Sequence, residues 1–141
     1  MMRVFQKILV GYDGSDNGRR ALQAVAELAK KFSSKVYVVE VVDEASLYAT
    51  GMLPPTSVIE EMWKKAKADI DQAIASLQGI DVTGDVVSGY PPSAITDYAS
   101  KVGADLIVVG SRGLSTFKRI LLGSVSTAVV QESKVPVLVV K

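Results

Sequence analysis

The chain contains no cysteine and no histidine among its 141 residues. Without cysteine it has no disulfides, no thiolate nucleophile and no zinc–thiolate site. Without histidine it lacks the usual general base and the commonest metal ligand. Catalysis by Ser-His-Asp or Cys-His groups is therefore excluded within this chain alone.

A dominant charge and long apolar runs are missing as well. Sixteen Lys plus Arg balance fifteen Asp plus Glu, which leaves a net charge of +1 and does not indicate a nucleic-acid surface. The N-terminal region has only a short apolar stretch, residues 8–10, before Asp13, and no run of eighteen apolar residues follows. We therefore expect a cytoplasmic protein without membrane insertion.

Apolar residues indicate strands that alternate with helices along the whole chain. Strands are predicted at residues 8–10, 36–42, 82–87, 106–109 and 135–140. The first helix has Ser15, Asp16 or Asn17 as its N-cap candidates, and residues 43–57 are predicted to form a long loop before the second helix, which Gly79 ends. The last helix is predicted to begin at Ser124 and to bury three side chains: Val125, Ala128 and Val129.

Five strands alternating with helices predict a single open, doubly wound α/β domain over residues 1–141. Strands that are apolar on both faces favour a five-stranded parallel sheet with helices on both faces, joined by right-handed crossovers. Ligands of such sheets bind beyond the carboxyl ends of the strands, where the strand order reverses. Residues 11–15, 41–43 and 110–126 are expected to meet there.

A glycine motif follows the predicted strand at residues 106–109. Gly110, Gly113, Gly123 and Ser124 spell G-x2-G-x9-G-S. Glycines at a strand end allow a tight turn and a close approach to a ligand, and a helix that begins at serine presents free N–H groups to an anion. The motif therefore predicts a phosphate, of a nucleotide, although ordinary turns and an ordinary serine cap also fit these residues.

The usual nucleotide fingerprints are absent, because the chain has no G-x-x-x-x-G-K-[ST] and no G-x-G-x-x-G after its first strand. Instead the chain resembles the universal stress protein family, within the adenine-nucleotide alpha hydrolase-like group. Four segments carry the resemblance: KILVGYDGS at 7–15, GYP at 89–91, the glycine motif at 110–126 and VPVLVV at 135–140. In that family the full glycine motif separates ATP-binding members from the others, and this chain keeps it in full.

The resemblance implies a role for each loop residue. Asp13 would lie beside the ribose or a phosphate-bound Mg²⁺, Val41 would meet adenine through its backbone, and Tyr12 and Val109 would be neighbours of the nucleotide. Three residues would run along the ribose and phosphates: Gly110, Arg112 and Gly113. Four would donate to the phosphate chain: Gly123, Ser124, Val125 and Ser126.

Several of these residues have a simpler explanation. Asp13 also suits a turn or capping role, and Arg112 a solvated loop charge. In the long loop, Tyr48, Met52 and Leu53 are either a lid over adenine or side chains packed onto the following helix. The helical spacing around Trp63 favours a core or interface position over a ligand cage.

The last predicted strand lies at the chain end and leaves an apolar edge that invites pairing. In the resembling family this strand pairs with its copy, so we expect a homodimer through it. The leading hypothesis is an ATP-binding regulator or sensor in stress response, with ATP, ADP or AMP and Mg²⁺ as ligands and an unidentified protein partner. The alternatives are a slow Mg²⁺-dependent ATPase, with no catalytic residue assigned, and a dimeric adaptor in which nucleotide is incidental.

Overall fold

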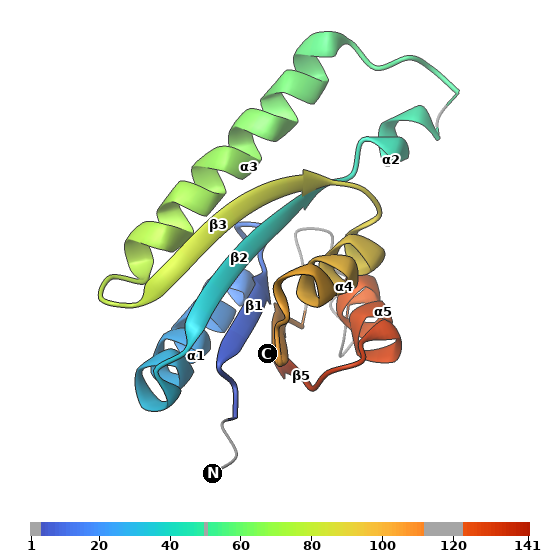
Figure 1. Ribbon diagram of the computed structural model, residues 1–141. Coiled ribbons are helices and arrows are strands. Elements are labelled where there is room, and N and C mark those ends of the chain that lie inside the picture. The colour runs from blue at the N-terminus through green and yellow to red at the C-terminus, as the bar shows by residue number, and fades with distance from the viewer. Residues whose placement is uncertain (1–3, 50, 112–122) are drawn as a thin grey trace.

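The computed structural model describes residues 4–49, 51–111 and 123–141 (Figure 1). Strands and helices alternate along the chain, except that two helices follow β2. In order they are β1 (Lys7–Gly11), α1 (Asp16–Phe32), β2 (Lys35–Val42), α2 (Ala45–Tyr48), α3 (Thr56–Ser76), β3 (Asp81–Ser88), α4 (Pro91–Val102), β4 (Leu106–Gly110), α5 (Ser124–Glu132) and β5 (Val137–Val140).

All five strands are parallel and lie in the order β3-β2-β1-β4-β5. At the centre of the sheet, Val10 of β1 lies beside Val38 of β2 and Val108 of β4. The strand order reverses between β1 and β4, since the chain builds outward to β3 on one side and to β5 on the other. The predicted open, doubly wound α/β sheet is confirmed.

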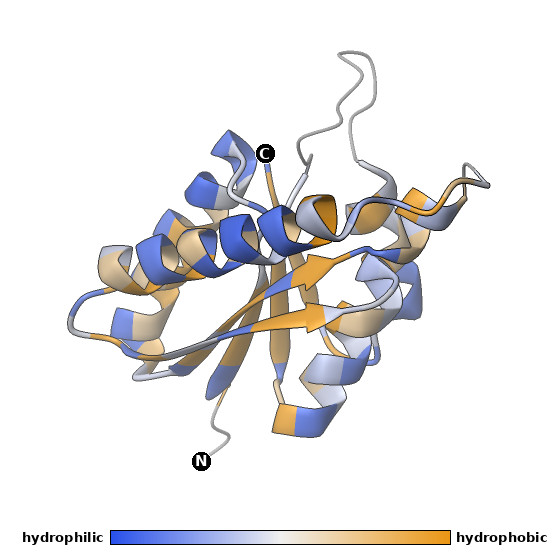
Figure 2. Ribbon diagram, turned by 90° about the horizontal axis from the view of Figure 1, so that it is seen from above, coloured by the Kyte–Doolittle hydropathy of each residue, from blue (hydrophilic) through white to orange (hydrophobic). Residues whose placement is uncertain are grey.

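Helices cover both faces of the sheet, with α1 and α3 on one face and α4 and α5 on the other (Figure 1). Alternate residues of β1 divide between these layers, because Ile8 and Val10 pack with α1 and α3 while Leu9 packs with α4. Figure 2 shows apolar residues concentrated along the strands between the helices. A strand enclosed on both faces must be apolar throughout, which explains the continuous runs in the sequence.

Ser15 is the N-cap of α1 among the three candidates. Its Oγ accepts a hydrogen bond of 3.1 Å from the backbone N–H of Gly18. This bond satisfies one of the donors that the first turn of a helix leaves free. It also fixes the point at which the chain leaves β1 and enters α1.

Residues 43–57 do not form one continuous loop, because α2 lies within them. The side chain of Asp43 accepts from the N–H of Ser46 at 3.2 Å, and this bond starts the short helix. The next helix, α3, ends at Ser76, and Gly79 lies in the turn beyond it with φ of +82°. The expected long loop was therefore wrong in part.

The inward face of α5 differs from the prediction at Val125, which is 38% exposed, whereas Ser126 is 3% exposed. The hydroxyl of Ser126 lies 3.1 Å from the carbonyl oxygen of Ser111 and 3.0 Å from that of Gly123, and it donates to these acceptors. A hydroxyl with such partners can be buried at little cost. Ser126 and Val129, three residues apart, therefore form the buried side of α5.

No helix within the described residues is both long enough and apolar enough to cross a membrane.

Candidate functional site

An open cavity of about 470 Å³ lies at the carboxyl ends of β1 and β4, where the strand order reverses. The helices that follow β1 and β4 leave on opposite faces of the sheet, so they do not close the space above the strand ends (Figure 1). The carboxyl end of β2, the start of α4 and Met62 of α3 complete its wall. This is the position where open α/β sheets bind their ligands.

The cavity brings together every predicted site residue in the described part of the chain. These residues are Tyr12, Asp13, Val41, Val109, Gly110, Gly123, Ser124, Val125 and Ser126. Arg112 and Gly113 lie outside the described residues. The three segments expected to meet thus contribute to one cavity.

The turn after β1 is held by its own side chains. Asp13 Oδ1 accepts from the backbone N–H of Ser15 at 3.0 Å, and Lys65 of α3 donates to the carbonyl oxygen of Asp13 at 3.4 Å. The turn role considered for Asp13 is therefore real. Because Asp13 also lines the cavity, its carboxylate stands at the end of a strand with one oxygen engaged in the turn.

Gly110 allows the start of α1 to approach the end of β4. A Cβ atom on Gly110 would lie 2.9 Å from the carbonyl carbon of Asn17 and 3.0 Å from its oxygen, distances that real Cβ atoms avoid. The Asn17 side chain also donates to Ser111 Oγ at 3.1 Å. The absent side chain at position 110 thus makes room for the protein's own backbone, a role that the ligand-based interpretation of this glycine missed.

The first turn of α5 faces the cavity through Ser124, Val125 and Ser126. Their backbone N–H groups precede the first hydrogen bond of the helix, from Thr127 N to Gly123 O at 3.0 Å. Free N–H groups and the positive end of the helix dipole favour an anion at this place.

Ser111 and Gly123 are joined to each other next to this helix start. Gly123 donates its N–H to the carbonyl oxygen of Ser111, and Ser126 Oγ reaches the same oxygen. Ser111 is 2% exposed, so this junction is buried. It fixes the N-terminus of α5 relative to the end of β4.

The opposite wall of the cavity is apolar. Val39 and Val41 face it from β2, with Met62 from α3 and Ile95 from α4. An apolar wall opposite a helix start suits a ligand that has one flat, weakly polar end and one anionic end.

Trp63 is half-buried and is not part of the cavity wall. Its Nε1 donates to Glu44 Oε1 at 2.7 Å and so ties α3 to the residue before α2. Trp63 belongs to neither core cluster of the described residues, so the core alternative is not seen and the interface alternative stays a prediction. Met52 and Leu53 are 74% and 87% exposed, so the expected packing of these two side chains onto the helix is wrong, and their role as a lid stays a prediction.

Sequence reasoning missed a charged cluster around the buried Glu40, on the other face of β2. Glu40 faces α3, where Lys65 and Asp69 lie 2.6 Å apart as an ion pair. Burial, followed by the neighbouring Asp69, raises the pKa of Glu40 to about 8. The signal was present in the sequence, since Glu40 is the only charged residue within the apolar run at 36–42.

Comparison with known proteins places this geometry in a family. Residues 5–141 match the Universal stress protein family. The solved structure of protein MJ0577 from Methanocaldococcus jannaschii is 31% identical, with a TM-score of 0.86 and coverage of 98% of this chain and 96% of that one.

Two further solved relatives carry adenine nucleotides. A universal stress protein in complex with cAMP is 33% identical, with a TM-score of 0.65 and coverage of 98% of both chains. One from Archaeoglobus fulgidus in complex with dAMP is 26% identical, with a TM-score of 0.72 and coverage of 98% of this chain and 99% of that one. On the match over residues 5–141 and the shared fold, the chain belongs to the universal stress protein family.

Proposed function

We propose that residues 1–141 form a single nucleotide-binding domain, an ATP-binding member of the universal stress protein family that acts as a nucleotide-dependent regulator. The observation that carries this proposal is the first turn of α5, whose N–H groups face a cavity at the point where strand order reverses. The adenine nucleotides bound by two relatives support the ligand class.

In the proposed pose, the phosphates lie at Ser124, Val125 and Ser126, and adenine lies against the apolar wall near Val41. Val109 and Gly110 lie between these two ends, at the carboxyl end of β4. Tyr12 and Asp13 border the ribose side. Arg112 and Gly113 join the phosphate side in this proposal on the strength of the glycine motif alone.

The resident ligand can be identified directly. Freshly purified protein is denatured, and the released small molecules are separated by chromatography beside ATP, ADP and AMP standards. Stripped protein is then titrated with each nucleotide. We expect saturable binding of ATP at one site per chain; protein that carries no adenine nucleotide and binds none would contradict the proposal.

Mg²⁺ fits this site only as part of a metal–nucleotide complex. Among the described residues no cluster of three Asp, Glu, His or Cys side chains can hold a metal. Asp13 and Asp43 both line the cavity, and Asp43 Oδ1 accepts from the N–H of Ser46. Mg²⁺ commonly takes one or two carboxylates together with phosphate oxygens and water, and we assign that role to Asp13, which follows the end of β1. Asp13 would hold the ion and so bring the phosphate chain close to the strand end.

Asp13→Asn should reduce the effect of Mg²⁺ on ATP binding roughly tenfold. The amide keeps an oxygen that accepts from Ser15 N–H and therefore preserves the turn, but it removes the charge. Without Mg²⁺ the variant should bind ATP at least as well as the native chain, because a negative charge beside the phosphates is gone. Calorimetric titrations with and without Mg²⁺ measure this, and an unchanged ratio between the two affinities would remove Asp13 as the ion's ligand.

We further propose a homodimer through β5, the strand at one edge of the sheet. Leu138 is exposed on this apolar strand, and Pro136 precedes it. Sedimentation equilibrium should give twice the chain mass for the native protein. Leu138→Lys should give a monomer that still binds ATP, because a charged side chain would lie in the proposed apolar interface. A variant that stays dimeric, or a native monomer, would contradict the proposed interface.

A slow ATPase and a dimeric adaptor are the alternatives to this regulatory role. A turnover assay on stripped, reloaded protein addresses the ATPase alternative. Phosphate release well above that of a binding-defective variant would favour an enzyme over a regulator.

A further inference from the structure

Glu40 is a carboxyl group inside the fold, at 8% exposure, in the layer between the sheet and α3. It shares its face of β2 with Val36 and Val38, which belong to the apolar core under α1 and α3. Within the described residues, Oε1 of Glu40 is buried and accepts no hydrogen bond. A buried carboxylate without a donor is costly, so this atom needs an explanation.

Two residues of α3 lie against Glu40. The ammonium of Lys65 is 3.9 Å from Glu40 Oε2, too far for a hydrogen bond, and bonds instead to Asp69 Oδ2 at 2.6 Å. Asp69 therefore lies next to Glu40, because the same ammonium contacts both carboxyl groups. Two ionised carboxylates in contact repel each other and have no proton to share, whereas one proton between them supplies the missing donor.

We propose that Glu40 keeps its proton at neutral pH and shares it with Asp69 through a hydrogen bond, and that this shared proton is a pH-sensitive contact joining β2 to α3. When the proton leaves, the buried charge of Glu40 faces the negative charge of the partly buried Asp69 across that layer. The contact between α3 and the sheet is then weakened on the side next to the cavity.

The surrounding charges agree with a retained proton. Burial, and then the hydrogen bond and charge of Asp69, raise the pKa of Glu40 to about 8, while Lys65 acts in the opposite direction. The charged and titratable groups around the pair are Asp69 and Lys65 on α3, Asp13 and Tyr12 in the turn after β1, and Arg19 on α1, which bonds to Tyr12. Of the groups that act on Glu40 itself, only Lys65 favours its ionised form.

The pair also bears on the turn that lines the cavity. A Cβ atom on Gly14 would lie 2.9 Å from either carboxylate oxygen of Asp69, and Lys65 donates to the carbonyl oxygen of Asp13. A shift of α3 would therefore move this turn. We therefore expect ATP affinity to fall as pH rises through about 8, and this expectation rests on the proposed function.

Thermal unfolding at different pH values tests the shared proton in nucleotide-free protein. The folded state holds a proton that an unfolded glutamate releases near pH 4.5, so native stability should fall from about pH 4.5 to about 8 relative to Glu40→Gln. The glutamine stays neutral at every pH and can donate to Asp69. We expect the melting temperature of the native chain to drop by several degrees against this variant over that window.

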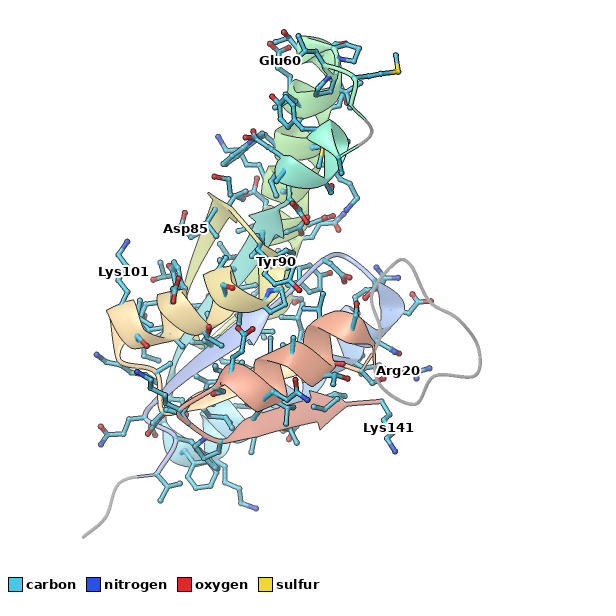
Figure 3. All side chains as sticks on the ribbon, turned by 90° about the vertical axis from the view of Figure 1, so that its right-hand side faces the viewer. Arg20, Glu60, Asp85, Tyr90, Lys101 and Lys141 are labelled. Atoms are coloured by element: carbon cyan, nitrogen blue, oxygen red, sulfur yellow. The ribbon has the colours of Figure 1, made fainter. Side chains whose placement is uncertain are left out.

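Glu60→Gln is the matched control, because Glu60 is exposed near the outer end of α3, away from the sheet (Figure 3). It makes the same replacement of a carboxyl group by an amide and should leave the pH profile parallel to that of the native chain. Parallel profiles for the native chain and Glu40→Gln would overturn the proposal.

Infrared difference spectra of the native protein detect the proton on the carboxyl group directly, so they test the proposal even if Glu40→Gln does not fold. Native protein should show the carbonyl band of a protonated carboxyl group at pH 7, and that band should vanish as pH passes about 8. Absence of the band at pH 7 would overturn the shared proton. If the native chain binds no nucleotide at any pH while the band is present, the proposed function fails and the shared proton stands.

Discussion

Ser124→Asp is expected to weaken ATP binding roughly 100-fold while leaving the fold at least as stable as that of the native chain. Ser124 lines the cavity at the first position of α5. A carboxylate there faces the proposed phosphates, and two charges about 4 Å apart repel each other by about 1 to 4 kcal/mol, depending on solvent access. The same carboxylate is favourable for the helix, because it lies near the positive end of the helix dipole.

Ser124→Asn separates charge from shape, because asparagine has nearly the same size as aspartate and is neutral. It should retain binding within a few-fold of the native chain. Calorimetric titration with ATP, together with melting temperatures, compares the three proteins. Equal affinities for the Asp and Asn variants would show that no anion binds at the start of α5.

Gly84→Val is expected to lower the free energy of unfolding by about 2 to 3 kcal/mol. Helix α3 packs directly over this glycine of β3, where a Cβ atom would lie 2.4 Å from Ile70 Cγ2 and 2.8 Å from Ile74 Cδ1. Ile70 is 5% exposed and its Cγ2 is attached to its own Cβ, so it cannot turn away without repacking the core. The helix must shift outward, which outweighs the higher strand propensity of valine.

A double-mutant cycle with Ile70→Ala identifies the collision as the cause. Ile70→Ala alone should destabilise the fold by about 2 to 5 kcal/mol, since it leaves a cavity. Together the two substitutions should cost at least about 0.5 kcal/mol less than their sum, because the valine fills the space that the alanine leaves. Urea unfolding gives these values, and strict additivity would mean that the close approach of α3 to Gly84 does not set the cost.

Much of the fold could be predicted because its signals are local. The apolar run at 36–42 contains a strand that is enclosed on both faces, and Ser15 caps α1 from among three neighbouring candidates. In a parallel sheet of this kind the strand order determines where ligands bind, at the carboxyl ends next to the reversal. The segments around Asp13, Val41 and Ser124 follow such strand ends and therefore converge.

The remainder depends on contacts between distant segments. Hydrophobicity alone predicted that Val125 faces inward. In the structure Ser126 is buried instead, because its hydroxyl donates to the carbonyl oxygen of Ser111. The four residues of α2 are too few to show a helical period. Glu40 was visible as an unusual charge in a buried strand, yet its partner Asp69 comes from another element and is known only from the packing of α3.

The most direct test of the central claim is to follow the amide signals of isotopically labelled, nucleotide-stripped protein by NMR during a titration with ATP. We predict saturable shifts at the start of α5, Ser124 to Ser126, and at Val41 and Gly110, all of which line one cavity. Signals that do not move at any ATP concentration would contradict the account. So would shifts confined to the separate hollow between α4 and the end of α5, around Thr96 and Lys134.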